Sequence, residues 1–141
     1  MTYFKSLLFN FLTVFFVNHM IPGVDIIYYT KLPSIEGDII FAFALGLLNS
    51  LIFPVMHFFK FKPSYFKIGF VAFLISFAGY ALINLFPLGV NVKTPGAFIW
   101  SGLIVWFASY LTNHLELRAY HIRKDMKEKE EKIFREKKEK K

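Results

Sequence analysis

The chain has 141 residues, of which 55% are hydrophobic and 20% are aromatic, including 19 phenylalanines. The apolar residues form long blocks, and a soluble globule of this length cannot bury so much bulky apolar surface, so the composition excludes a soluble fold. The net charge of +7 does not indicate a nucleic-acid partner, because 11 of the 17 Lys and Arg residues lie in the last 24 residues. Cysteine is absent, which excludes disulfides and thiol chemistry.

Four apolar blocks predict an all-α polytopic membrane protein with four transmembrane helices. The first block is the shortest, and each of the others has 21 residues, enough to cross a hydrocarbon layer about 30 Å thick. The predicted spans cover residues 6–22, 39–59, 68–88 and 97–117. Lys5 before the first block is also typical of a signal peptide, but no small-residue cleavage site follows, so we expect this helix to be retained.

The basic residues predict that both termini lie in the cytoplasm. Fifteen Lys and Arg residues fall before the first span, between the second and third, or after the fourth, whereas only Lys31 and Lys93 fall on the other side. Positive charge is enriched in cytoplasmic segments of membrane proteins. We therefore expect a multi-pass protein with an even number of spans.

An internal repeat predicts two tandem helical hairpins. The turn at residues 22–26 (PGVDI) resembles the turn at residues 87–92 (PLGVNV), and the proline and glycine of each end a helix. The alternating residues that follow would pair as small strands or lie at the membrane interface. Both copies have the same topology, unlike the inverted repeats of many transporters.

The second predicted span holds the candidates for helix packing. Ala42, Gly46 and Ser50 follow one another at a spacing of four, which predicts a face that allows close backbone approach. This face would serve packing within one chain or a homo-oligomer. Pro54 lacks the amide hydrogen that would bond the Ser50 carbonyl, so it predicts a kink after Asn49, and a fixed kink and a hinge are both open.

Every predicted span contains asparagine, and these amides are expected to bond across helices and form a polar seam. They are Asn10, Asn18, Asn49, Asn84 and Asn113. Charged residues are absent from mid-membrane depth, and Glu116 is expected to reach Arg118 or headgroup water at its helix end. The four histidines complete no zinc motif or triad, so the sequence predicts no catalytic, cofactor or metal site.

Residues 118–141 form a charged tail with 11 basic and six acidic residues. Four pairs place an acid four residues before a base, which predicts a cytoplasmic helix that continues the fourth span. The chain would thus divide into a transmembrane domain, 1–117, and this tail. The tail's excess of positive charge would attract anionic lipid, and its broken apolar stripe would suit a cytoplasmic protein.

Residues 45–54 (LGLLNSLIFP), the Pro22-Gly23-Val24 turn and the four spans resemble phage holin superfamily IV, a group of small bacterial membrane proteins. The resemblance covers about residues 3–115. It implies a four-helix protein of the bacterial inner membrane that forms oligomeric lesions during lysis. The long charged tail departs from the usual form of this family.

Three functions are compatible with these patterns. The first is a non-enzymatic, holin-like protein that acts through helix association, with Ala42, Gly46, Asn49, Ser50 and Pro54 as its informative positions. The second is a membrane scaffold whose tail recruits a protein or anionic lipid. The third is a small carrier that uses the asparagine seam.

Overall fold

The computed structural model describes residues 3–26, 37–85 and 89–140. In chain order, the elements are α1 (Tyr3–Met20), β1 (Val24–Ile26), α2 (Gly37–Ser50), α3 (Ile52–Phe58), α4 (Tyr65–Leu85), β2 (Val90–Val92) and α5 (Pro95–Glu139). The predicted all-α class is confirmed, because the two strands have only three residues each.

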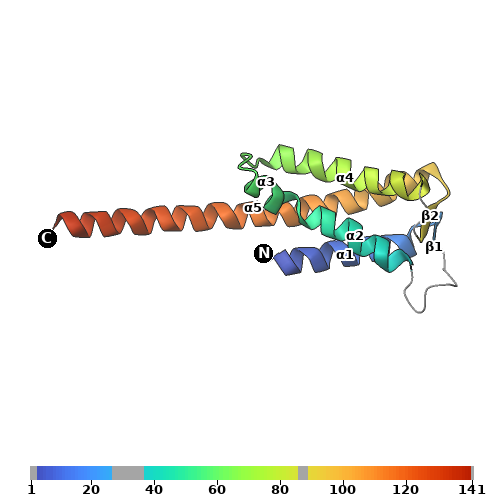
Figure 1. The fold of residues 1–141 in the computed structure, drawn as a ribbon, viewed down its shortest axis with the longest axis horizontal. Coiled ribbons are helices and arrows are strands. Elements are labelled where there is room, and N and C mark those ends of the chain that lie inside the picture. Colours follow the sequence, from blue (N-terminus) through green and yellow to red (C-terminus); the bar gives the residue numbers. More distant parts are fainter. Residues whose placement is uncertain (1–2, 27–36, 86–88, 141) are drawn as a thin grey trace.

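The helices form two hairpins that pack together. α1 lies along α2, α4 lies along α5, and α1 also packs against α5, so the first and last helices close the bundle (Figure 1). At one end, here called the strand end, β1 and β2 join the hairpins. At the other, the tail end, α1 begins, α3 turns into α4, and α5 leaves the bundle (Figure 1).

The two repeated turns pair with each other. β1 and β2 are antiparallel, with Val24 opposite Val92 and Ile26 opposite Val90, which confirms that these segments form small strands. The Lys93 amide donates to the Gly23 carbonyl at 2.8 Å, and the Lys93 ammonium pairs with Asp25. Pro87 and Leu88, the start of the second turn, lie outside the described residues.

The second predicted span is bent, as Pro54 predicts. α2 and α3 are separated at Leu51 and form an angle of 42°. α3 begins two residues before the proline, where a missing amide hydrogen does least harm to a helix. The kink is therefore confirmed.

Within the described residues, α4 and α5 are each long and apolar enough to cross a membrane, and the bent pair α2–α3 would make a third crossing. α1 has 18 residues, but Lys5, His19 and two asparagines lower its mean hydropathy.

The exterior of the bundle is apolar, unlike that of a soluble bundle, and its core combines apolar with polar side chains. Large apolar side chains cover the outside; Phe4 is 70% exposed and Phe66 is 83% exposed. Asparagine and serine side chains fill much of the inside, including Asn49 and Ser76. Such an arrangement suits a hydrocarbon solvent, in which polar groups must bond within the protein.

The charged tail continues α5 without interruption to Glu139, and residues 121–140 are exposed. Its ion pair at 3.9 Å joins Lys124 to Glu128, with the base before the acid. Across the described part of the tail, none of the four acid-first pairs of the sequence pattern lies within 4.0 Å.

Gly89 is expected to be essential to the strand end. Its φ is +108°, and an added Cβ would lie 2.3 Å from the Gly37 backbone. Gly89→Ala should lower the thermal midpoint of the purified protein by several degrees, because the strained backbone costs about 1–3 kcal/mol. Gly96→Ala is the control, since a Cβ there meets nothing within 4 Å. Equal midpoints for the two variants would contradict this role.

Candidate functional site

The bend between α2 and α3 is braced by one side chain of α5. Asn113 Oδ1 accepts the Phe53 amide at 3.0 Å, and Asn113 Nδ2 donates to the Asn49 carbonyl at 2.8 Å. In an uninterrupted helix, the Phe53 amide would bond the Asn49 carbonyl directly. The Asn113 amide is thus inserted into this backbone hydrogen bond and satisfies both groups that the bend separates.

Other asparagines connect the remaining helices. Asn10 of α1 donates to the Thr112 hydroxyl at 3.0 Å, and the Ser76 hydroxyl of α4 donates to Asn49 Oδ1 at 3.4 Å. Near the strand end, the Tyr80 hydroxyl donates to Asn18 Oδ1 at 3.0 Å, and Asn84 Oδ1 accepts the Val92 amide at 3.1 Å. The structure therefore contains the polar seam that the sequence predicts.

The strand end holds a buried acid that the sequence analysis did not pair. Asp38 is fully buried, and its Oδ2 lies 3.3 Å from His19 Nε2. His19 Nδ1 is 2.8 Å from the Phe15 carbonyl, which can only accept. The imidazole of His19 thus lies between the Phe15 carbonyl of its own helix and the Asp38 carboxylate of α2. His19 and Asp38 are 19 positions apart, so no helical spacing reveals the contact.

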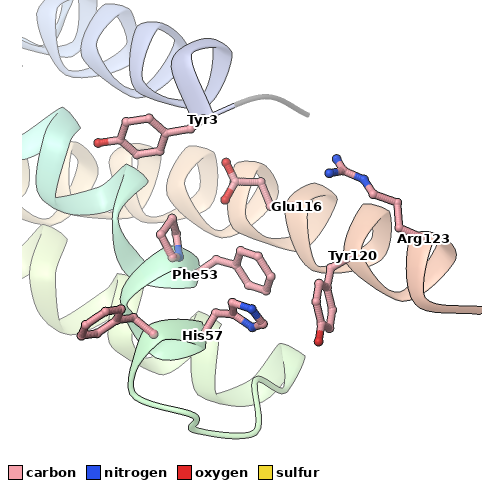
Figure 2. A pocket seen from close by; sticks show the side chains of 8 residues that line it. Tyr3, Phe53, His57, Glu116, Tyr120 and Arg123 are labelled. Carbon is pink, nitrogen blue, oxygen red and sulfur yellow. The ribbon is translucent and has the colours of Figure 1, made fainter. Parts of the chain in front are cut away.

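A pocket of about 400 Å³ lies at the tail end, between the start of α1, α3 and α5. Figure 2 shows Glu116, Tyr120 and Arg123 on α5, with Tyr3 from α1 on one side and Phe53 and His57 from α3 on the other. The sequence predicts that Glu116 reaches Arg118 or headgroup water, and this prediction is wrong. Glu116 is 7% exposed, lies next to Ser6 of α1, and makes no ion pair with Arg118 among the described residues. Its helix face points into the bundle instead of toward water.

A comparison with known protein families matches residues 1–118 to the family described as mycobacterial phage holin with four transmembrane segments, superfamily IV. The chain belongs to this phage holin family. No curated protein and no solved structure matches it.

The family match confirms the resemblance that the sequence suggests and makes the chain a membrane protein with apolar helices. Its description includes four transmembrane segments, whereas the helices described here supply two or three crossings by length and composition. The match ends at residue 118, so nearly all of this chain's charged tail lies outside the matched region.

Four of the five packing candidates lie inside the bundle. Ala42, Asn49 and Ser50 are fully buried, and a Cβ added at Gly46 would lie 2.8 Å from the Phe11 amide nitrogen. Gly46 thus lets α2 approach the backbone of α1. Pro54, by contrast, lines the pocket at the tail end.

Three residues with a clear structural role were not singled out from the sequence. Thr112 and Tyr80 anchor two asparagines, and Gly102 admits the Phe77 ring, whose nearest atom would lie 2.6 Å from an added Cβ. Thr112 and Gly102 directly adjoin Asn113 and Ser101 in the sequence. The sequence nevertheless gives no partner for either residue on another helix.

Asn113→Leu is expected to lower the free energy of unfolding by about 2 kcal/mol or more, because it leaves two backbone groups of the bend without a partner. In a Pro54→Ala background, the helix can straighten and the Phe53 amide can bond the Asn49 carbonyl, so the loss should be less than half as large. A double-mutant cycle in mixed micelles measures this coupling. Asn91→Leu, at an exposed strand position, is the control. If the losses of stability from Asn113→Leu and Pro54→Ala were additive, the proposed role of Asn113 at the bend would be contradicted.

Proposed function

We propose that this chain is a non-enzymatic, holin-like protein of the bacterial inner membrane that acts through helix association. Residues 1–117 would form a four-span transmembrane domain, and residues 118–141 a cytoplasmic helix. The observation that carries the proposal is the family match over residues 1–118, together with the apolar exterior of the bundle.

The geometry supports association between copies as the route to permeability. The polar side chains inside one bundle bond with each other and hold its helices together. A water-filled path would therefore form between copies, or after the seam opens. Ala42, Gly46, Asn49, Ser50 and Pro54 are the positions at which the α2–α3 span would control this packing.

Leakage of dyes of graded size from liposomes tests the proposal. Liposomes with the purified protein should release small dyes and retain large ones, and the protein in nanodiscs should have the mass of a discrete oligomer. The chain cut after residue 118 should leak equally, since the tail lies outside the bundle. Tight liposomes together with a monomeric mass would reject the holin-like function.

The topology is tested by cysteine labelling, because the natural chain has no cysteine. With both termini in the cytoplasm, a membrane-impermeant maleimide should label Asn91→Cys in intact spheroplasts. It should label Lys62→Cys only after the membrane is permeabilised. The opposite pattern would reverse the proposed orientation.

The tail favours a second candidate, a membrane scaffold. Ile122, Met126, Ile133 and Phe134 are each at least half exposed on a helix that has left the bundle. Such side chains would suit a cytoplasmic partner, or anionic lipid through the surrounding basic residues. Cutting the tail would remove this recruitment and leave leakage intact.

A small carrier that uses the asparagine seam would be distinguished by Asn49→Leu. This substitution would abolish transport in a carrier, whereas in the other two functions it would change only stability.

A further inference from the structure

The tail-end pocket contains a buried acid whose bonding capacity is not used. Glu116 Oε1 is buried and has no hydrogen-bond partner among the described residues. The carboxylate lies at the pocket wall, facing the space between α1 and α3 (Figure 2). Ser6 of α1 lies beside the carboxylate, but Oε1 itself has no hydrogen-bond partner among the described residues. A buried acceptor without a donor is costly, so this geometry indicates a site for a group that carries N–H donors and positive charge.

The surroundings of the pocket have the opposite charge. Exposed basic residues occur at the start of α1, between α3 and α4, at the start of α4, and on α5 next to the pocket: Lys5, Lys60, Lys62, Lys67, Arg118 and Arg123. Arg123 itself lines the pocket and lies seven residues after Glu116, on the same face of α5. Basic side chains at this position attract lipid phosphates. The pocket thus offers a carboxylate inside and a guanidinium farther along α5.

We propose that this pocket binds the phosphoethanolamine headgroup of an aminophospholipid, with the ammonium at Glu116 and the phosphate at Arg123. The inference rests on the proposed membrane placement but not on lesion formation. The volume of about 400 Å³ lies in the ordinary range for small ligands, about 300–1,000 Å³. Phe58, which is exposed, also lines the pocket and offers an apolar surface to the lipid.

The chemistry of the pocket selects among headgroups. An ethanolamine ammonium donates hydrogen bonds to Glu116, whereas a choline ammonium has no N–H group and a glycerol headgroup has no positive charge. The aromatic side chains add a surface for the cation: the Tyr120 ring lies 4.9 Å from the His57 ring and 5.9 Å from the Phe53 ring. These contacts hold α3 against α5 and keep the pocket formed.

Native mass spectrometry of the full chain in detergent tests the proposal. Phosphatidylethanolamine, phosphatidylcholine and phosphatidylglycerol with identical acyl chains are offered in equal amounts. The protein should retain phosphatidylethanolamine by about tenfold over each of the others, the size that one charge-assisted hydrogen bond supports. Glu116→Gln should remove this preference, and Glu128→Gln, an exposed acid of the tail, should leave it unchanged.

Arg123→Gln gives a second measurement that does not depend on the folding of the Glu116 variant. Arg123 is exposed, and its replacement should lower retention of phosphatidylethanolamine severalfold, while Arg135→Gln should not. Equal retention of the three lipids by the natural chain, or an unchanged preference in Glu116→Gln, would overturn the proposal. Tyr3 lines the pocket, so the chain's own amino group is the competing occupant. The proposal would also be overturned if phosphatidylethanolamine were preferred only after the amino terminus had been extended.

Discussion

The insertion of the Asn113 amide into the backbone of the bent span is the constraint on which the rest of the bundle depends. Lipid offers no donors or acceptors, so the break at Leu51 is stable only if another helix satisfies the groups that it frees. Asn113 does this and thereby fixes the register of α5 against α2 and α3. The hydroxyl of the neighbouring Thr112 accepts a hydrogen bond from Asn10 of α1. One turn of α5 therefore sets the position of both hairpins and of Glu116, which follows three residues later.

The same polar contacts restrict how several copies would make a lesion. A water-filled opening needs a polar lining, but the exterior of the bundle carries aromatic and aliphatic side chains, such as Phe66. The seam, by contrast, is polar and is occupied by hydrogen bonds within one chain. Association through the apolar exterior thus assembles copies without exposing a polar surface. In the proposed holin-like function, permeability would require that seam contacts exchange their partners, and the hydrogen bonds of Asn113 would then oppose this exchange.

The features predicted correctly from sequence are those that a residue determines locally. Pro54 lacks an amide hydrogen wherever it lies, so it predicted the bend, and the alternating pattern around Asp25 and Asn91 predicted strands. The partners of the polar residues could not be predicted, because helical spacing gives a face but not what faces it. Glu116 shows this limit: its position near a helix end suggested contact with water, but packing of α1 and α3 around it made it buried. The contact between His19 and Asp38 likewise exists only once the first hairpin has closed.

The length of α5 has a mechanical consequence. Its 45 residues correspond to roughly 68 Å of uninterrupted helix, and the exposed part from residue 121 onward projects beyond the bundle (Figure 1). Gly102 is its last glycine, and no proline follows Pro95, so no flexible joint separates the projecting part from the part that holds Asn113. The projecting part is therefore a lever. A torque applied near Glu139 would be transmitted along a single rod to the residue that braces the bent span.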